Sequence, residues 1–171
     1  MDFPTMIIAT QAFHENTLEY GQGLNKIYNR LALDYLYEDT KSVLTFLDNH
    51  DTDRFLLTEP KNLGAWKQGV AFLLTTRGIP QIYYGTELLM HGDKKKTDGD
   101  VRKDVPGGFP GDKINAFTRE GRTKLQNEAI DFMSKVANWR KGNKVISEGS
   151  LKHFMPENGM LVIIRGRVSS F

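Results

Sequence analysis

The chain has 171 residues, of which 39% are hydrophobic and 26% charged, a composition typical of a folded globular domain rather than a disordered one. Its 23 lysines and arginines nearly balance 21 acidic residues, so the net charge of +2 gives no reason to expect a nucleic acid or an anionic membrane as a partner. The absence of cysteine excludes disulfides, thiolate metal sites and cysteine nucleophiles, and no run is apolar for long enough to span a bilayer.

The first predicted elements alternate between helix and strand. Apolar residues at steps of three and four predict a helix over residues 24–37. Residues 42–47 form a short, unbroken β-prone run, which is the pattern of a strand buried on both faces. Asn62 is expected to cap the next helix. A second buried strand is expected over residues 79–84, with Pro80 at its entry.

The second half of the chain begins with a long loop over residues 91–122, which is rich in Gly, Asp, Lys and Pro and too long for a plain connector. Apolar periodicity then predicts a helix over residues 125–140. Residues 151–155 and 160–165 flank Asn158-Gly159, which is a strong β-hairpin signal. The alternation of apolar strands and amphipathic helices predicts an α/β fold, with βα units around a parallel sheet, followed by the hairpin.

The strand predicted at 42–47 runs directly into a polar segment, Asp48-Asn49-His50-Asp51-Thr52-Asp53-Arg54. In parallel α/β architectures the ligand site lies at the carboxyl ends of the strands, where His50 and Asp51 would emerge. A carboxylate there could stabilise a developing positive charge, and an imidazole could bind a hydroxyl group. The same residues also fit an Asx-type turn with a helix cap at Thr52 or Asp53, and the local chemistry does not choose between the two.

The strand predicted at 79–84 is likewise followed by a glycine and an acid, Gly85 and Glu87. Tyr83 and Tyr84 would point to opposite faces of the strand, and we expect both to have structural roles. Glu87 fits either a site carboxylate or an ion-pair partner of Arg54.

These two segments resemble conserved regions of the α-amylase family. Phe-Leu-Asp-Asn-His-Asp at residues 46–51 is similar to the end of the seventh barrel strand, and Gly-Ile-Pro-Gln-Ile-Tyr-Tyr-Gly-Thr-Glu at 78–87 looks like the eighth. They occur in the right order, with one helix between them. Residues 1–4 resemble the end of the sixth strand, and the loop at 99–112 is similar to neopullulanase- and cyclomaltodextrinase-like members.

The resemblance covers essentially the whole chain and implies a partial (β/α)8 barrel, with strands six to eight and their helices over residues 1–145. Residues 146–171 would be the start of an all-β C-terminal domain. The chain opens without the preceding strands and stops at residues 167–171, directly after one hairpin. We therefore expect it to be part of a longer protein, and the compartment is left open because a signal sequence would lie upstream.

The family implies a retaining glycosidase acting on α-glucans such as starch, maltooligosaccharides, cyclodextrin or pullulan. By resemblance Asp51 is the third carboxylate, which stabilises the transition state, and His50 binds a sugar hydroxyl. Asn49, Arg54 and the loop residue Phe109 are expected to bind substrate. The family's nucleophile and general acid follow the fourth and fifth strands, and this sequence matches neither motif. Because retaining hydrolysis needs both groups, we expect this chain alone to be inactive.

Two other interpretations are considered. A non-catalytic carbohydrate-binding module would use Trp66, Trp139 or Phe109 as stacking platforms, although both tryptophans fit apolar helix faces and are expected in the core. A doubly wound nucleotide-binding domain would require a glycine-rich fingerprint, which is absent from the sequence.

No cofactor is predicted. Calcium is considered because several aspartates share the long loop: Asp93, Asp98, Asp100, Asp104 and Asp112. The run Lys94-Lys95-Lys96 among them favours a solvated loop of mixed charge.

A partial barrel would leave strands with unpaired N–H and C=O groups. Such an edge is a template for association, so we expect self-association through the open barrel edge.

Overall fold

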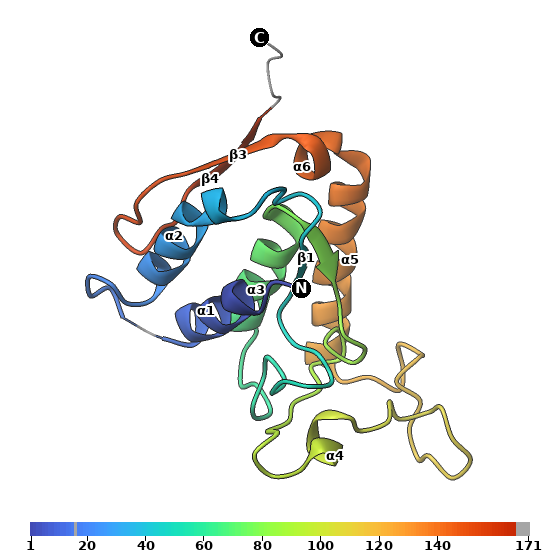
Figure 1. Cartoon of the computed structure of the whole chain (residues 1–171). Coiled ribbons are helices and arrows are strands. Elements are labelled where there is room, and N and C mark those ends of the chain that lie inside the picture. The colour runs from blue at the N-terminus through green and yellow to red at the C-terminus, as the bar shows by residue number, and fades with distance from the viewer. Residues whose placement is uncertain (16, 167–171) are drawn as a thin grey trace.

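The computed structural model describes residues 1–15 and 17–166 (Figure 1). The elements in chain order are α1 (Phe3–His14), α2 (Leu24–Ala32), the 3-10 helix η1 (Asp34–Leu36), β1 (Leu44–Phe46), α3 (Gly64–Thr75), β2 (Ile79–Gln81), α4 (Asp98–Val101), α5 (Lys124–Gly142), α6 (Lys144–Glu148), β3 (Ser150–His153) and β4 (Ile163–Gly166). Residues 167–171, which come directly after the predicted hairpin, lie outside the described residues. None of the described helices combines the length and apolarity needed to cross a membrane.

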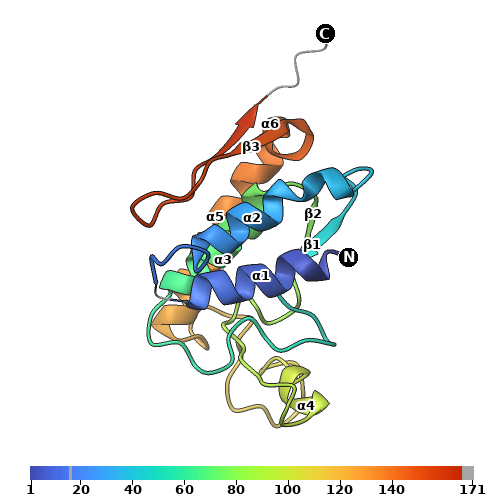
Figure 2. The ribbon, with the colours of Figure 1, turned by 60° about the vertical axis from the view of Figure 1, so that its left-hand side comes forward.

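β1, α3 and β2 form a parallel βαβ unit, and its three elements are labelled in Figure 2. Leu44 pairs with Ile79 and Phe46 with Gln81. The predicted parallel arrangement is therefore confirmed, although each strand has only three residues. On α3, Trp66 and Val70 are buried in a core that is shared with α1, α2 and α5.

The second strand differs from the prediction in burial. Ile79 is 51% exposed, so the expectation of a buried strand is wrong there. The physical reason is the topology: β2 pairs with β1 on one side, and no further strand of the described chain lies along its other edge. Pro80 lies in the middle of β2, opposite Thr45, and an edge strand tolerates its missing N–H.

The helix α1 was not predicted from the sequence. Residues 1–4 were expected to end a strand, but the Asp2 carboxylate caps α1 by accepting the Thr5 N–H at 3.1 Å, and Pro4 occupies the first turn. One bond does join this segment to the sheet, because the Asp2 N–H donates to the Leu44 carbonyl at 2.8 Å. Apolar residues lie on all sides of α1, since Ile7 is exposed and Ala9 is buried. They therefore show no clear helical periodicity in the sequence.

The remaining helices follow the predictions with shifted ends. α2 stops at Ala32 and is followed by η1. α3 begins at Gly64, so its N-cap residue is Leu63 and the predicted cap at Asn62 is wrong by one position, although the Asn62 side chain accepts the Gly64 N–H at 3.0 Å. α5 begins after a capping box formed by Thr123 and Gln126. Among the two tryptophans, Trp66 is buried as expected.

Trp139 is 49% exposed, so its predicted place in the core is wrong. It lies near the end of α5, where the neighbouring Arg140 already donates to the Leu74 and Thr76 carbonyls at the end of α3. Because a helix has 3.6 residues per turn, consecutive side chains point in different directions, so Trp139 is turned away from the face on which Arg140 meets α3.

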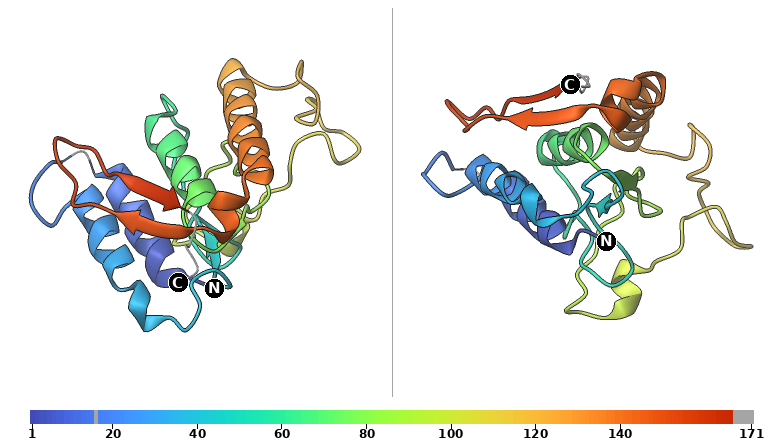
Figure 3. Two further views of the ribbon diagram at one scale, coloured as in Figure 1. Left: turned by 90° about the horizontal axis from the view of Figure 1, so that it is seen from above. Right: turned by 45° about the horizontal axis from the view of Figure 1, so that its top comes forward.

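The predicted hairpin is confirmed: β3 and β4 pair antiparallel, and Asn158 and Gly159 both have positive φ in the connecting turn. Seen from above, the hairpin runs across the helices (Figure 3). It lies at the end of the molecule opposite α4 (Figures 1 and 2).

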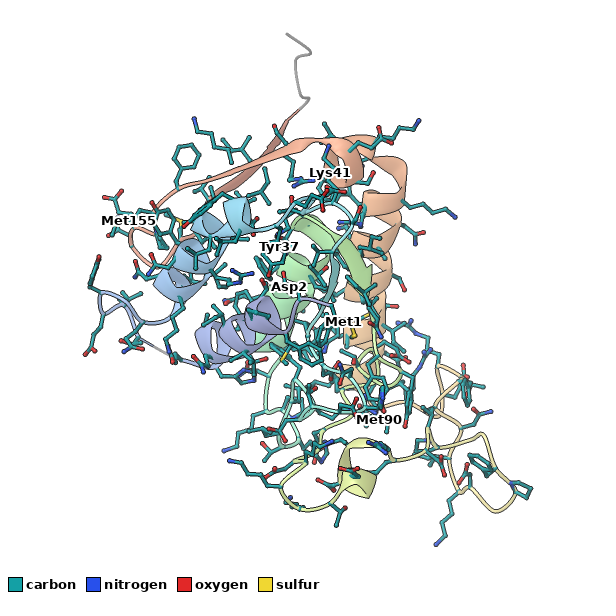
Figure 4. The ribbon with its side chains drawn as sticks, in the orientation of Figure 1. Met1, Asp2, Tyr37, Lys41, Met90 and Met155 are labelled. Atoms are coloured by element: carbon teal, nitrogen blue, oxygen red, sulfur yellow. The ribbon has the colours of Figure 1, made fainter. Side chains whose placement is uncertain are left out.

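A buried cluster of charged groups joins the N-terminus of α1 to the start of β2. Asp2 and Arg77 are 1% and 2% exposed, and Arg77 Nη1 lies 2.5 Å from Asp2 Oδ2. Asp34 binds the other side of the same guanidinium at 2.5 Å, and the Tyr37 hydroxyl donates to Asp2 at 2.9 Å. Figure 4 shows Asp2 and Tyr37 side by side. Arg30 from α2 completes the cluster, 3.4 Å from Asp2.

The cluster keeps Asp2 ionised. Burial alone would raise the pKa of its carboxyl, but the hydrogen bonds from Thr5 and Arg77 and the charge of Arg77 outweigh burial and lower the pKa to about 2.

Replacing Asp2 with Asn should lower the free energy of unfolding by about 3–5 kcal/mol, because Arg77 stays buried and loses one of its two carboxylate partners. Urea unfolding at neutral pH measures this. Asp39→Asn is the matched control, since Asp39 is exposed and bonds only to the adjacent Lys41 and Ser42; it should change stability by less than about 1 kcal/mol.

The difference in stability between the wild type and Asp2→Asn should also depend on pH. Because folding lowers the pKa of Asp2 from 3.8 to about 2, its contribution is fully present above about pH 4 and is lost as the pH falls toward 2. The stability difference between the wild type and Asp2→Asn should shrink by roughly 2–3 kcal/mol over that range. A difference that stays constant would contradict the role given to Asp2.

Candidate functional site

The polar segment after β1 folds into an Asx turn. The Asn49 side-chain oxygen accepts the Asp51 N–H at 2.7 Å, and the Asn49 N–H donates to the Thr52 hydroxyl at 3.0 Å. Asn49 is 2% exposed, so its side chain shapes the turn from inside. No helix follows at Thr52 or Asp53, so the predicted cap is wrong, but the predicted turn is present.

Asp48 fixes this turn to the rest of the fold. Its buried carboxylate accepts the Phe55 N–H at 3.0 Å and the Thr86 hydroxyl at 2.9 Å, which joins both ends of the turn to the segment after β2. Burial raises the pKa of this carboxyl, against the lowering effect of these two hydrogen bonds. The Asp48 bonds leave the residues between 49 and 54 little freedom.

His50 and Asp51 lie at the tip of the turn and face solvent. Their side chains are 62% and 58% exposed, and His50 Nε2 lies 3.2 Å from Asp51 Oδ2. The two interpretations of the sequence are therefore compatible, because the Asx turn is what presents the imidazole and the carboxylate together.

The long loop after β2 packs directly against this turn. The Arg54 N–H donates to the Gly92 carbonyl at 3.1 Å, and the Gly92 N–H donates to the Leu56 carbonyl at 3.0 Å. The Lys94 N–H donates to the Asp53 side chain at 2.7 Å. A side chain at position 92 would place its Cβ 2.3 Å from the Asp100 carbonyl oxygen, so only glycine lets the two parts of the loop approach this closely.

The loop brings two cations to Asp51. Arg102 Nη2 lies 3.4 Å from Asp51 Oδ1, and Lys94 Nζ lies 4.0 Å from the same oxygen. Asp98 pairs with both cations, at 3.2 Å from Lys94 and 3.1 Å from Arg102. The hydrogen bond from Lys94, followed by the charge of Arg102, lowers the pKa of Asp98. Arg102 Nε also donates to the His50 carbonyl at 3.0 Å.

These residues were not predicted to belong to the site. Lys94 and Asp98 were expected in a solvated loop, and the available signal was that Asp98 lies four residues after Lys94 and four residues before Arg102.

Arg54 was predicted to bind substrate, but its side chain is turned inward and the residue is only 1% exposed. Its guanidinium donates to the carbonyls of Val101 at 2.9 Å and Tyr84 at 2.6 Å. It also lies over the Tyr83 ring, 4.0 Å from the centroid. Burial, followed by the hydrogen bond with Tyr84, raises the pKa of Tyr83 to about 12. Arg54 therefore ties the turn to the loop and to the end of β2.

The other predicted partner of Arg54, Glu87, forms no ion pair with it within residues 1–15 and 17–166; Glu87 instead lines a cavity beside α5. Phe109 is 59% exposed, on a loop segment held by the Asp112 carboxylate, which accepts its N–H at 3.0 Å. In the described part of the chain no hydrogen bond, ion pair or ring contact joins Phe109 to His50 or Asp51.

The aspartates of the loop bond to nearby groups. Asp100 pairs with Lys103 at 2.6 Å, and Asp112 accepts the Gly107 N–H at 2.6 Å. Across the described residues no three His, Cys, Asp or Glu side chains are grouped as metal ligands.

A family described as "Alpha amylase, catalytic domain" matches residues 1–145. A cyclomaltodextrin glucanotransferase of Niallia circulans is 33% identical over 165 residues, which are 96% of this chain and 20% of the relative. The chain thus spans about a fifth of the length of the curated relatives that it matches.

Solved structures show the same likeness. A γ-CGTase from alkalophilic Bacillus clarkii matches with a TM-score of 0.70 and 29% identity, over 95% of this chain and 21% of the other. An α-amylase from Geobacillus thermoleovorans, complexed with acarbose, matches with a TM-score of 0.74 over 99% of this chain and 34% of the other. At 24% identity the second likeness concerns the fold alone.

Replacing Arg54 with Met should destabilise the chain by about 2–4 kcal/mol, because two carbonyl groups lose a charged donor. It should also release the loop, so that trypsin cleaves faster after Lys94, Lys95 or Lys96. Urea unfolding and timed proteolysis measure the two effects.

The control is Arg119→Met, which removes an exposed arginine paired with Asp131 and should cost less than about 1 kcal/mol. Unchanged cleavage of the loop in Arg54→Met would contradict the anchoring role.

Proposed function

The chain belongs to the α-amylase family, and from that premise we propose that it supplies part of the active site of an enzyme that cleaves α-linked glucans. The observation that carries the proposal is the turn after β1, which exposes His50 and Asp51 side by side at the carboxyl end of a parallel strand. The match to the α-amylase catalytic domain over residues 1–145 supports it.

Each side chain has a proposed role. Asp51 stabilises the positive charge that develops on the sugar ring in an oxocarbenium-like transition state. His50 donates a hydrogen bond to a sugar hydroxyl in the same subsite. Asn49 and Arg54 are positioning residues, which act through the turn and the loop that they hold, and Phe109 is an exposed platform on the loop. Lys94 and Arg102 orient the Asp51 carboxylate.

Retaining hydrolysis needs a nucleophile and an acid/base about 5–5.5 Å apart, and Asp51 alone supplies neither role. We propose that residues 1–145 contribute the seventh and eighth strands of the barrel, as β1 and β2, together with the helices around them. We further propose that residues 146–171 begin a separate all-β domain and that the catalytic pair belongs to the preceding strands. The isolated chain is therefore proposed to be inactive.

The substrate class rests on chemistry and on the relatives. A neutral, hydroxyl-rich substrate suits an exposed imidazole and carboxylate, and the similar proteins are named for cyclomaltodextrin transfer and for α-amylase. We propose starch, maltooligosaccharides, cyclodextrin or pullulan as substrates, with a neopullulanase- or cyclomaltodextrinase-like specificity suggested by the sequence of the loop at 99–112.

A second candidate is a carbohydrate-binding module without catalysis. The exposure of Phe109 and Trp139, at 59% and 49%, is the observation that favours it, because both rings are available for stacking on sugars. Glucan binding that persists in a full-length protein without turnover would select this candidate.

Reducing-sugar release from maltoheptaose, cyclodextrin and pullulan tests the enzyme proposal. The chain of residues 1–171 should release none, a form extended by the preceding barrel strands should be active, and Asp51→Asn in that form should lower kcat by at least about a hundredfold. Asp39→Asn is the control and should leave kcat unchanged, because Asp39 is exposed and its side chain bonds only to Lys41 and Ser42. Appreciable turnover by the short chain would overturn the proposal that its catalytic pair lies elsewhere.

The open edge of β2 leads to a further proposal, self-association of this chain. Ile79 in β2 is 51% exposed, Ile82 just after β2 is 39% exposed, and no other strand of the described chain pairs with β2 besides β1.

Light scattering after size exclusion should show a mass that rises with concentration, and Ile79→Lys should return it toward the monomer. Ile164→Lys is the matched control, since Ile164 is 50% exposed on the hairpin, away from this edge. A monomer at all concentrations would count against association.

A further inference from the structure

A polar cleft lies apart from the turn that carries His50 and Asp51. It has a volume of about 770 Å³ and is bounded by the end of α1, the starts of α2 and α3, and the turn between β3 and β4. None of its lining residues belongs to the turn at 48–54 or to the loop at 91–103. Its volume is in the range of clefts that hold small organic ligands, about 300–1,000 Å³.

Five carboxamide side chains line this cleft. Asn62 uses its side-chain oxygen to accept the Gly64 N–H at 3.0 Å, and the other four come from different segments. Gln22 precedes α2, Asn25 lies on α2, Gln68 lies on α3, and Asn158 lies in the hairpin turn. Within residues 1–15 and 17–166, none of these four side chains makes a hydrogen bond to another protein group. Each offers two donors and an acceptor oxygen without carrying charge.

The acidic side chain of the cleft is already paired, and the imidazole of His14, which also lines it, lies with Nδ1 2.8 Å from the Thr10 carbonyl oxygen. Glu15 lines the cleft, but its carboxylate accepts the Gly23 N–H at 2.8 Å and binds Lys26. The hydrogen bond from Lys26 is the main cause of the lowered pKa of Glu15. A cleft with paired charges and free carboxamides suits a neutral ligand with many hydroxyl groups better than an anion or a cation.

Apolar side chains line the cleft together with the carboxamides. Phe13, Leu18, Leu24 and Pro156 also line the cleft. Sugars present hydroxyl groups at their rims and C–H groups on their faces, so a lining that mixes carboxamides with apolar side chains matches both surfaces.

The position of the cleft gives a second argument. Gln22, Asn25 and Gln68 lie within the region matched to the catalytic domain, whereas Asn158 lies beyond residue 145, on the hairpin. Ligand sites are common at such junctions, where two structural units contribute different walls. A ligand here would contact the hairpin and three helices at once.

We propose that this cleft is a second saccharide site, which binds a short α-linked glucose oligomer and holds it away from the Asp51 turn. The cleft geometry points to a neutral oligosaccharide, and its identity as an α-glucan rests on the proposed function. The ligand bridges α2 and α3 to the hairpin, so its binding also stabilises the contact between these parts.

Titration of the 171-residue chain with maltohexaose in a calorimeter tests the proposal. The double variant Asn25→Leu, Gln68→Leu should weaken binding by at least about tenfold, because two neutral hydrogen-bonding groups are lost. Asn29→Leu is the matched control, an exposed asparagine on α2 outside the cleft, and should leave the affinity unchanged.

Amide chemical shifts give an independent readout. Maltohexaose should perturb residues 62–68 and 156–159 more than residues 49–54. No detectable binding by the wild-type chain, or equal binding by the wild type and the double variant, overturns the cleft as a site.

Cellotetraose, a β-linked glucose oligomer, tests the assignment to α-glucans. It should not compete with maltohexaose, and equal or tighter binding of cellotetraose would overturn that assignment. None of these measurements uses turnover, so failure of the cleft and failure of the proposed enzyme activity are separate results.

Discussion

The buried contact between Asp2 and Arg77 is the constraint on which the arrangement of the chain depends. Two charged groups that are almost fully removed from water are stable only when each is paired, and here one guanidinium is shared by Asp2 and Asp34. The pair joins the first helix to the residue just before β2, which are 75 residues apart in sequence. Arg30 and Tyr37 fill the remaining hydrogen-bonding positions around Asp2. The N-terminus, α2 and the sheet are thereby held together at one end of the parallel strands.

The turn that carries His50 and Asp51 lies at the other end of the same strands and is fixed by another buried carboxylate. Asp48 is buried and uses both carboxylate oxygens, one for Phe55 and one for Thr86, so the segments after β1 and β2 keep a constant separation. Arg54 then links the turn to the loop through two backbone carbonyls. The exposed groups, His50 and Asp51, are the part of this arrangement that is not used for folding. The buried residues beneath them, Asp48, Asn49 and Arg54, hold the turn in the shape that keeps both side chains exposed.

The long loop over residues 91–122 makes two kinds of contact that its composition does not indicate. Its backbone pairs with residues 54–56, and its cations meet Asp51 while sharing Asp98. Exposed ion pairs of this kind contribute little to stability. The proposed saccharide cleft differs in kind, because neutral carboxamides line it and its one carboxylate is paired with Lys26. One chain thus presents a charged turn and a neutral cleft, both built from segments distant in sequence.

The sequence by itself determined the parallel βα order, the hairpin at Asn158-Gly159 and the polar turn after β1, because hydrophobic period, turn chemistry and a family motif are local signals. It did not reveal α1, whose apolar residues surround the helix, or the exposure of Ile79 and Trp139, which depends on what packs beside them. Arg54 shows the limit most clearly. Its position in the motif indicated the site, but only the tertiary structure decided that its guanidinium points inward, because the carbonyls that bind it come from residues 84 and 101. Contacts over such separations depend on how the segments pack, and no local pattern encodes them.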